Sequence, residues 1–398
     1  MLRKIILLRH AKSSWKDPLL RDFDRPLSKR GMNDNGQFLI ELKGIIRFQK
    51  IDEVKSNKKY RECNVDFNNF SFGSVFTDHM FECDFINGKW VNPTIKPYQP
   101  ISIEPSASVL HYGQAIFEGM KAYKDENNEV WLFRPDQNFE RINKSAVRMA
   151  IPEFPKELFF EALTKLVDID RDWVKYGEGR SMYIRPFVIG NEYAIQAVPS
   201  KNYKFMIICA PATLYYTKKL KVLVADKYSR AASGGVGYAK AAGNYAGQFY
   251  PTNLAKEQGF DQVVWTDSNE HSYLEEAGTM NIFFRINNTL ITAPTTDTIL
   301  DGVTRKSIIQ IAKDHEINVE VKKLTVEELK NAANDGTLKE IFGAGTAAVV
   351  SQIKAFQHKG ELFELEEQNN SYAEKLKSIL VGIQTNKLED KHSWRYKV

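Results

Sequence analysis

Ser233-Gly-Gly-Val-Gly-Tyr-Ala-Lys240-Ala-Ala-Gly-Asn-Tyr245 is a run of small residues around a single lysine. A lysine amine in such surroundings can form a Schiff base and act as a covalent catalyst. The glycines also suggest a dinucleotide-binding loop, which would need a third glycine after Gly235 and Gly237. Because Lys240 stands at that third position, the dinucleotide fingerprint fails. We therefore take Lys240 as the candidate catalytic residue.

Length and composition indicate a globular protein of more than one domain. The chain has 398 residues, of which 43% are hydrophobic, and this is enough for two or three domains. The apolar run over residues 5–8 is too short for a signal peptide, and no later stretch approaches a membrane span. We expect a cytoplasmic protein with no membrane partner.

The charge and the cysteines exclude two classes of function. Residues 1–35 hold nine Lys and Arg against four Asp, which accounts for the whole net charge of +5 and leaves the remainder neutral. A nucleic-acid partner is not expected, because phosphates require a basic surface. Cys63, Cys83 and Cys209 show neither metal-site spacing nor a disulfide framework. We expect reduced thiols and no metal.

The N-terminal segment has a pattern of its own. A strand over residues 4–8 leads into Arg9-His10, and Asp24-Arg-Pro-Leu-Ser-Lys-Arg-Gly31 follows. This resembles the start of the histidine phosphatase superfamily, particularly the small phosphohistidine phosphatases, and it stops near Asn35. The resemblance implies that Arg9 binds phosphate and that His10 is the nucleophile, but nothing downstream supplies the remaining phosphatase residues. We expect residues 1–40 to be a truncated fragment and residues 41–62 a linker.

From Val65 onward, apolar runs and amphipathic stretches predict alternating strands and helices. The segment 211–220 is rich in turn residues and is expected to join two domains, 63–213 and 214–398. The fold class is therefore α/β and α+β. The predicted elements are strands or strand-containing units at 90–91, 115–123, 130–133, 182–188, 205–209, 222–225, 262–265, 281–284 and 289–292, and helices at 158–167 and 307–314.

A lysine Schiff base needs a carboxylate for the cofactor ring nitrogen, a donor to the ring oxygen and a site for a phosphate. The run Glu275-Glu276-Ala-Gly278 places carboxylates beside a strand, and the spacing to Gly278 favours Glu276 over Glu275. The turn at Gly302 precedes a helix start, where free N–H groups bind phosphate. We expect the glycines of Gly343-Ala-Gly345-Thr346 to form a second, nest-like cradle.

These residues carry a family resemblance over residues 64–398. The set Glu276-x-Gly-x-x-Asn281-Ile-Phe283, Leu290-x-Thr292 and Leu300-x-Gly302-Val303-x-Arg305 resembles the class IV aminotransferase signature. Within that class, Tyr112-Gly-Gln-Ala-Ile-Phe-Glu-Gly-Met-Lys121-Ala-Tyr123, Leu132-Phe-Arg-Pro135 and the Lys240 run look like the branched-chain amino acid aminotransferases. The resemblance implies pyridoxal phosphate fold type IV. That fold has a smaller α/β domain and a larger pseudo-barrel domain with the cofactor between them, here with a fused N-terminal fragment.

The resemblance also implies roles. Lys240 would hold pyridoxal 5'-phosphate and move the proton between substrate Cα and cofactor C4'. Glu276 would pair with the pyridine nitrogen, and Tyr245 with the ring hydroxyl oxygen. Contacts to the phosphate would come from Arg134, the backbone of Val303 and Thr304, and Thr346. Contacts to the substrate would come from Thr279 and Ala347 at its carboxylate and from Tyr112, Phe117, Tyr183 and Arg185 around its side chain, with Tyr112 supplied by the partner subunit of a homodimer.

The implied reaction is reversible amino transfer from L-leucine, L-isoleucine or L-valine to 2-oxoglutarate. Tyr183 and Arg185 alternate along a strand and so share a face. Aromatic walls suit the apolar substrates, and Arg185 suits glutamate. The alternatives are a class relative of the D-amino acid aminotransferase or aminodeoxychorismate lyase type, or phosphate chemistry at His10. The sequence does not rank the three amino acids, because one methyl group changes binding by only roughly 1–3 kcal/mol.

Overall fold

The structure, a computed structural model, describes residues 50–53, 65–67, 70–213, 215–216 and 218–398. The chain divides into two compact units, Met1–Lys50 and Ile51–Val398, and the described helices and strands belong to the second. The predicted N-terminal fragment with His10, and all of the predicted linker except residues 50–53, lie outside the described residues. The predicted boundary between residues 213 and 214 also stays a prediction.

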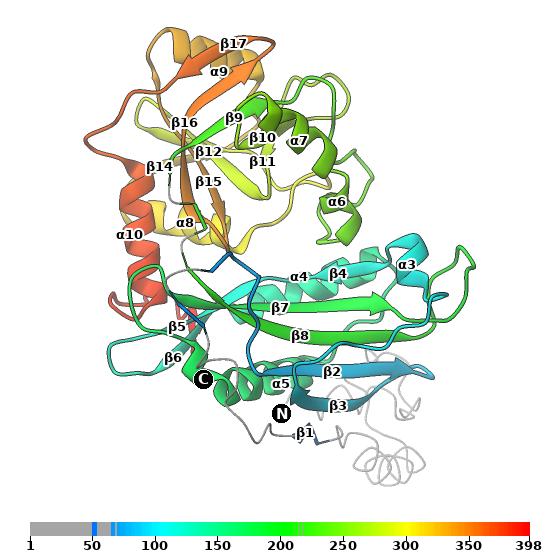
Figure 1. The fold of residues 1–398 in the computed structure, drawn as a ribbon. Coiled ribbons are helices and arrows are strands. Elements are labelled where there is room, and N and C mark those ends of the chain that lie inside the picture. The colour runs from blue at the N-terminus through cyan, green and yellow to red at the C-terminus, as the bar shows by residue number, and fades with distance from the viewer. Residues whose placement is uncertain (1–49, 54–64, 68–69, 214, 217) are drawn as a thin grey trace, which may run out of the picture. The chain divides into compact units, whose positions relative to one another are not determined.

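The first sheet is built largely from the N-terminal half of this unit (Figure 1). Its order is β1-β3-β2-β8-β7-β5-β6-β18, with β4 paired to β7, and only the β1–β3 pair is parallel. The C-terminal strand thus pairs with β6 at the end of a sheet formed otherwise by early segments. The strands are β1 Asp52–Glu53, β2 His79–Ile86, β3 Lys89–Pro97, β4 Ala115–Phe117, β5 Met120–Lys124, β6 Val130–Phe133, β7 Ser181–Gly190, β8 Tyr203–Ala212 and β18 Arg395–Lys397.

Two helices accompany this sheet, α4 (Pro135–Arg148) and α5 (Lys156–Ile169). In α5, Leu158, Ala162 and Leu166 recur every four residues and are buried, as an amphipathic helix requires. They belong to one apolar core with the sheet residues Phe81 and Phe205. This core fixes the platform from which β4, β5 and β7 present side chains toward the second sheet.

The second sheet closes on itself (Figure 1). Its order is β11-β10-β9-β16-β15-β12-β13-β14, and an additional β11–β12 pairing joins six of these strands into a barrel. Closure removes the unpaired edges that an open sheet would expose. The strands are β9 Leu220–Val224, β10 Gln262–Thr266, β11 Leu274–Ala277, β12 Met280–Ile286, β13 Thr289–Thr292, β14 Asn318–Val321, β15 Leu338–Gly345, β16 Val349–His358 and β17 Glu361–Glu364, which pairs with β16.

Two longer helices pack beside the barrel, α8 (Val303–Asp314) and α10 (Tyr372–Gln384). Ile308 of α8 and Leu376 of α10 share a buried core with Phe283 and Phe342, whose rings stack at 5.1 Å. This packing holds the start of α8 at the barrel. The remaining helices are α3 Ser108–Tyr112, the 3-10 turn η2 Arg171–Trp173, α6 Ala242–Ala246, α7 Phe249–Glu257 and α9 Val326–Asn334.

The mixed helix and sheet content confirms the predicted fold class, and strand 289–292 has the predicted bounds. The helix predicted from residue 307 begins instead at Val303, directly after the N-cap residue Gly302. Helices α4, α9 and α10 and strands β15 to β17 were not predicted. No helix within the described ranges is long and apolar enough to cross a membrane.

Candidate active site

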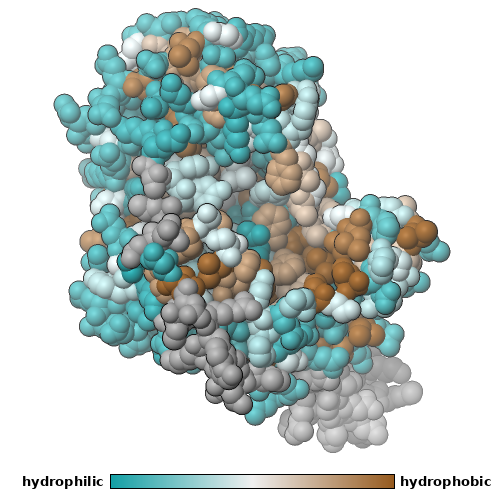
Figure 2. Space-filling model, viewed as in Figure 1, coloured by the Kyte–Doolittle hydropathy of each residue, from teal (hydrophilic) through white to brown (hydrophobic). Residues whose placement is uncertain are grey.

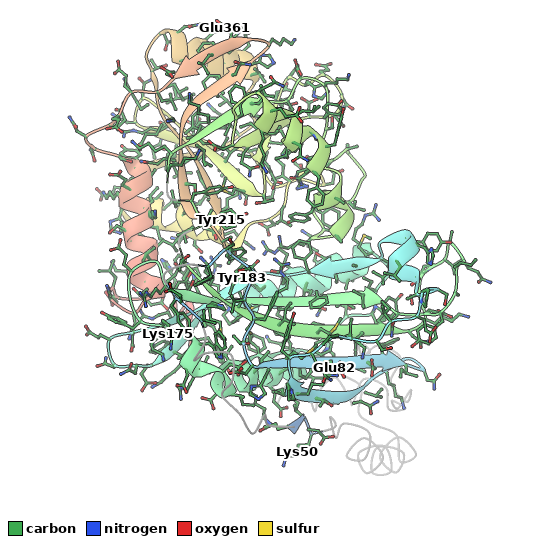
Figure 3. The ribbon with its side chains drawn as sticks, in the orientation of Figure 1. Lys50, Glu82, Lys175, Tyr183, Tyr215 and Glu361 are labelled. Atoms are coloured by element: carbon green, nitrogen blue, oxygen red, sulfur yellow. The ribbon has the colours of Figure 1, made fainter. Side chains whose placement is uncertain are left out.

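A cavity of about 590 Å³ lies between the two sheets, where the space-filling view shows a hollow with apolar side chains gathered beside it (Figure 2). Tyr183 from the first sheet and Tyr215 from the segment between the sheets are at its border (Figure 3). The lining includes most of the predicted site residues, from both sheets and the connecting segments: Phe117, Tyr183, Arg185, Lys240, Tyr245, Thr279, Val303, Thr304, Thr346 and Ala347.

The amine of Lys240 is held inside this cavity. Its Nζ donates a hydrogen bond of 2.5 Å to the hydroxyl of Tyr245 and lies 4.6 Å from the ring centre of Phe117. The backbone is fixed as well, because Lys240 N donates to Ser145 Oγ and Lys240 O accepts from Phe117 N. Desolvation, and after it the charge of Arg141, lower the pKa of Lys240 to about 8. The neutral, nucleophilic amine is therefore accessible near physiological pH.

The glycines before Lys240 serve close packing. A Cβ on Gly237 would lie 2.7 Å from the Cα of Thr298, so only glycine lets the run lie against that segment. Gly234 has φ +74° and its N–H bonds the carboxylate of Asp297. The glycine run is thus anchored to the loop after β13 and delivers Lys240 to the cavity.

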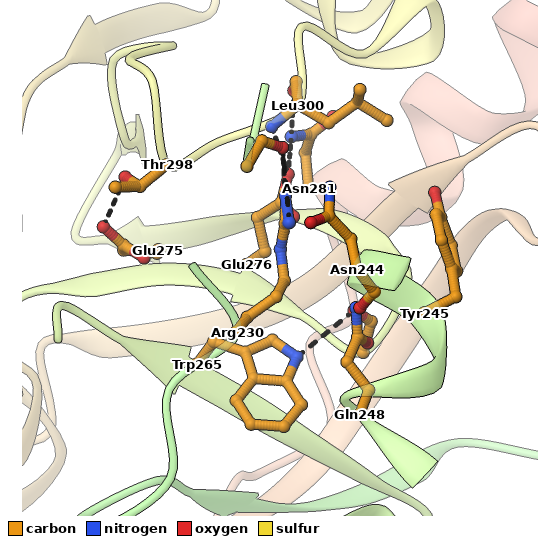
Figure 4. Close-up of polar contacts among 12 residues, drawn as sticks. Arg230, Asn244, Tyr245, Gln248, Trp265, Glu275, Glu276, Asn281, Thr298 and Leu300 are labelled. Carbon is orange, nitrogen blue, oxygen red and sulfur yellow. Dashed lines mark hydrogen bonds and ion pairs between the residues drawn. The ribbon is translucent and has the colours of Figure 1, made fainter. Parts of the chain in front are cut away.

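Glu276 is a buried carboxylate, and Figure 4 shows it among Arg230, Asn281 and Leu300. Its Oε1 accepts hydrogen bonds from Asn281 Nδ2 at 3.0 Å and Leu300 N at 2.8 Å, and its Oε2 lies 2.6 Å from Arg230 Nε. Burial raises the pKa of Glu276, and the charge of Arg230 is the strongest opposing influence. Glu276, Tyr245 and Thr279 together line a small cavity next to the large one.

The neighbouring carboxylate, Glu275, faces the other way, because successive residues of β11 point to opposite sides of the strand. Its Oε1 accepts from Thr298 Oγ1 at 2.6 Å, and it lines a separate cavity of about 410 Å³. Of the two carboxylates, Glu276 is the one near Tyr245, which agrees with the preference from glycine spacing.

The start of α8 presents backbone N–H groups of the kind that bind anions. The N–H groups of Val303 and Thr304 belong to the first turn, which has no intrahelical acceptor for them. A Cβ on Gly302 would lie 1.9 Å from Asn281 Oδ1, so this approach requires glycine. Arg134 reaches the same helix, since its Nη1 donates to Ser307 Oγ at 2.9 Å, but it does not line the 590 Å³ cavity.

The predicted nest at Gly343 and Gly345 is wrong. Both glycines lie in strand β15, and neither has a positive φ. A Cβ on Gly343 would lie 2.6 Å from the end of the Met280 side chain, so the glycine serves strand packing. Thr346 and Ala347 follow in a turn and do line the cavity. The carbonyl of Ala347 accepts from Nζ of Lys121, a buried lysine that sequence reasoning did not single out.

Tyr183 and Arg185 share a face of β7, as predicted from alternation. Arg185 Nη2 donates to the Tyr183 hydroxyl at 3.1 Å, and the guanidinium lies 4.6 Å from the Phe117 ring centre. Tyr112 does not line the cavity of its own chain. It is 46% exposed at the end of α3, and its hydroxyl donates to Ile195 O.

Two arginines near the lysine were missed by sequence reasoning. Arg141 makes a two-pronged pair with the fully buried Glu118, with Nε–Oε1 at 2.6 Å and Nη2–Oε2 at 2.8 Å, and its Nη1 donates to Asp301 O. Arg230, ten residues before Lys240, pairs with Glu276. No sequence motif marks either arginine, because the carboxylate that it contacts is distant along the chain.

These residues fit pyridoxal phosphate. The cofactor needs an amine that loses its proton easily, a hydroxyl close to the amine, backbone N–H groups for its phosphate and a buried carboxylate. The cavity of about 590 Å³ brings the first three together, and the carboxylate of Glu276 lines the small cavity next to it. At this helix start Gly302 has no space for a Cβ, which would lie 1.9 Å from Asn281 Oδ1. Among the described residues, no group of His, Cys, Asp and Glu is placed to hold a metal ion.

A lysine whose pKa is lowered by burial to about 8, and which lines one cavity with the first residues of a helix, is suited to transfer of an amino group. The chain belongs to the class IV aminotransferases, since the family described as amino-transferase class IV matches residues 115–356. A probable branched-chain-amino-acid aminotransferase of Staphylococcus epidermidis is 45% identical over 359 residues, which cover 89% of this chain and 98% of that protein. Branched-chain-amino-acid aminotransferase 2 of Bacillus subtilis is 43% identical over 351 residues, 87% of this chain and 96% of that one.

Solved structures agree on the fold. The branched-chain amino acid aminotransferase of Escherichia coli has a TM-score of 0.65 and 25% identity, with 80% of this chain and 98% of that chain covered. The enzyme of Thermobaculum terrenum, solved in its PLP form, has a TM-score of 0.65 and 20% identity over 80% of this chain and 98% of that chain. The family and the fold implied by the sequence resemblance are therefore confirmed, and the protein is a transaminase.

Proposed function

We propose that this enzyme transfers the amino group of L-leucine, L-isoleucine or L-valine reversibly to 2-oxoglutarate, with pyridoxal 5'-phosphate held on Lys240. The observation that carries the proposal is the Lys240–Tyr245 contact inside a cavity walled by Phe117, Tyr183 and Arg185. When bound, the cofactor supplies an electron-withdrawing ring that accepts the electrons released from the substrate Cα.

Lys240 would take the proton from the substrate Cα and pass it to the C4' atom of the bound cofactor, and in the reverse half reaction it would move a proton from C4' to Cα. A general base works best when its pKa is close to the working pH, and the pKa of Lys240 is lowered to about 8. Phe117 and Tyr245 flank the amine at 4.6 and 4.9 Å from their ring centres. These rings limit the directions in which Nζ can move and keep water away from it.

The remaining residues hold the cofactor. Glu276 accepts a hydrogen bond from the ring nitrogen, and the Tyr245 hydroxyl donates to the ring oxygen. The phosphate is bound by the N–H groups of Val303 and Thr304 at the start of α8, by Thr346 and by Arg134. The role of Arg134 is supported by its bond to Ser307, which belongs to the same helix as Val303 and Thr304.

One pocket must accept two kinds of substrate. Thr279 and Ala347 bind the α-carboxylate common to both, while Phe117 and Tyr183 contact a branched apolar side chain. Arg185 binds the second carboxylate of glutamate or 2-oxoglutarate, because its guanidinium borders the cavity and its Nε has no hydrogen-bond partner among the described residues. A pocket with aromatic walls and one guanidinium offers contacts to both kinds of ligand.

We propose further that the enzyme is a homodimer, in which Tyr112 of one protomer enters the substrate pocket of its partner. This is supported by the exposure of Tyr112 and by two exposed apolar neighbours, Leu110 at 57% and Ile195 at 69%. Sedimentation analysis tests the dimer. Because a surface residue remote from the active site should leave the KM for leucine unchanged, a raised KM in Tyr112→Ala supports the assigned role. The cytoplasmic location remains a prediction.

Borohydride reduction tests the site of cofactor attachment. Reduction of the cofactor-loaded enzyme followed by peptide mapping is expected to find the pyridoxyl label on Lys240, and Lys121 is the internal control, since it is also a buried lysine of the same region. Label on Lys121 alone would refute the assignment.

The choice of amino donor distinguishes this enzyme from a D-amino acid aminotransferase. A donor that reacts removes the absorbance band of the bound cofactor, and we expect L-leucine, but not a D-amino acid, to do so. Deletion of residues 1–40 should leave transamination intact if the phosphatase-like segment has no part in it.

A further inference from the structure

Arg230 contacts both Glu276 and the glycine run that precedes Lys240. Its side chain is only 5% exposed, and its Nε lies 2.6 Å from Glu276 Oε2. Its two terminal nitrogens both donate to the carbonyl of Gly237, at 2.9 Å from Nη2 and 3.3 Å from Nη1. Gly237 is three residues before Lys240 in the glycine run. Figure 4 shows Arg230 beside Glu276. A single guanidinium therefore connects the buried carboxylate to the loop that carries the lysine.

The other donors to Glu276 are neutral. Asn281 Nδ2 and Leu300 N bond to Oε1, whereas Arg230, alone among the described partners of Glu276, brings a positive charge into direct contact, at Oε2. A carboxylate oxygen has two acceptor positions, so Oε2 can accept another N–H besides that of Arg230. The second acceptor position of Oε2 is thus available for the N–H of a cofactor ring nitrogen.

A buried carboxylate without a cation tends to bind a proton and become neutral. A neutral carboxyl group would no longer stabilise a protonated ring nitrogen, and the ring would then withdraw electrons less strongly. The hydrogen bonds from Asn281 and Leu300 oppose protonation less than a full charge in contact does. Loss of Arg230 is therefore expected to change the charge state of Glu276 while leaving its position on β11 in place.

We propose that Arg230 is a positioning residue for the transamination reaction, which keeps Glu276 ionised for the cofactor ring nitrogen and fixes its distance from the Lys240 loop. This rests on the function proposed above. An arginine makes both contacts at once, through Nε to the carboxylate and through both terminal nitrogens to Gly237. A lysine carries the charge but is a point donor without the planar fork.

The test uses full-length enzyme loaded with cofactor that carries ¹⁵N in the ring, in wild type, Arg230→Gln, Arg230→Lys and Glu276→Gln. The ¹⁵N chemical shift of the ring nitrogen reports whether it is protonated, and it is measured from pH 6.5 to 9. Wild type and Arg230→Lys are expected to give the protonated shift at pH 7.5, and Glu276→Gln the unprotonated one. Arg230→Gln should follow Glu276→Gln at pH 7.5.

Kinetics and cofactor release give the second readout. In Arg230→Gln we expect kcat to fall ~10–100-fold, the range found when groups that orient metal ligands are removed from other enzymes, with a smaller change in KM. Arg230→Lys should recover most of kcat but release the cofactor faster than wild type, because its link to Gly237 is lost. A merely structural role would not restore the ring-nitrogen shift in Arg230→Lys.

The outcomes separate this inference from the proposed function. If wild type binds no pyridoxal phosphate, the proposed function fails. If wild type binds it and transaminates, but the ring nitrogen of Arg230→Gln stays protonated at pH 7.5, the role of Arg230 is overturned alone. Should Arg230→Gln not fold, an unprotonated ring nitrogen in Arg230→Lys would overturn the role equally well, because that variant retains the charge.

Discussion

Lys240 Nζ and the hydroxyl oxygen of Tyr245 lie 2.5 Å apart, five residues from each other across the start of α6. Burial shifts the two groups in opposite directions, lowering the pKa of Lys240 to about 8 and raising the pKa of Tyr245 to about 12. At neutral pH the tyrosine therefore keeps its proton and remains a hydrogen-bond donor. The amine, in contrast, loses its proton readily.

Capture of pyridoxal phosphate by the cofactor-free enzyme should depend on pH in a defined way. Only the neutral amine attacks an aldehyde, and the neutral fraction rises as pH increases through the pKa of Lys240, about 8. We expect the rate of appearance of the visible absorbance band to be half-maximal near pH 8. A free lysine side chain, with a pKa of about 10.4, is the reference. A half-maximal rate at that higher pH would contradict the assigned environment of Lys240.

Glu118→Gln should destabilise the protein strongly. Glu118 is fully buried and pairs with Arg141 through both oxygens, so the substitution leaves a buried guanidinium without its counter-charge. The expected loss is roughly 3–5 kcal/mol, measured as a fall in the urea midpoint. Glu361→Gln removes one partner of a pair with Lys330 in which Glu361 is half exposed, and it should cost about 0–1 kcal/mol. Equal effects of the two variants would argue against this account.

Gly302→Ala should weaken cofactor binding. The new Cβ would lie 1.9 Å from Asn281 Oδ1, which forces Asn281 to move and disturbs its bond to Glu276. Overpacking of this kind costs about 1–3 kcal/mol. Both the cofactor dissociation constant and the thermal midpoint should change. In Gly243→Ala the new Cβ meets nothing within 4 Å, so that control should keep or slightly raise its thermal midpoint. Unchanged cofactor affinity in Gly302→Ala would refute the close approach.

His358 should make stability depend on pH. Neither ring nitrogen has a partner in the described structure, and burial, followed by the charge of Lys359, lowers the pKa of this histidine. The unfolded chain then binds a proton at about pH 6.5 that the folded chain resists, so stability is lost as pH falls from about 7 toward 5. The thermal midpoint of His358→Leu minus that of wild type should therefore be larger at pH 5 than at pH 8. A difference between the two proteins that is the same at both pH values would exclude this role.

Local patterns sufficed for part of the fold. Thr289-Leu-Ile-Thr292 forms the predicted strand, since a β-branched and apolar run between turn residues has few alternatives. Barrel closure could not be predicted, because it depends on the pairing of Glu276 with Asn281 across a tight turn and on strands distant in sequence. Helix α10 was missed although Ala373, Leu376, Leu380 and Ile383 are spaced as one buried face.

The sequence likewise predicted only part of the candidate site. Lys240, Tyr245 and Arg185 line one cavity as the family spacing implied, because such spacing encodes the geometry of a common fold. The roles of Arg141 and Arg230 could not be predicted from the sequence, since the carboxylates that they contact are 23 and 46 positions away along the chain, respectively. The prediction of a nest at Gly343 was wrong because a glycine in a strand can also allow the close approach of a side chain, here that of Met280.

The most direct test of the central claim is the visible absorption spectrum of the cofactor-loaded enzyme during two successive additions. L-leucine should abolish the band of the Lys240-bound cofactor, and 2-oxoglutarate, added after removal of leucine, should restore it. Lys240→Ala should show neither change. A wild-type enzyme that develops no band with added pyridoxal phosphate, or a band that leucine leaves unaltered, would contradict the account.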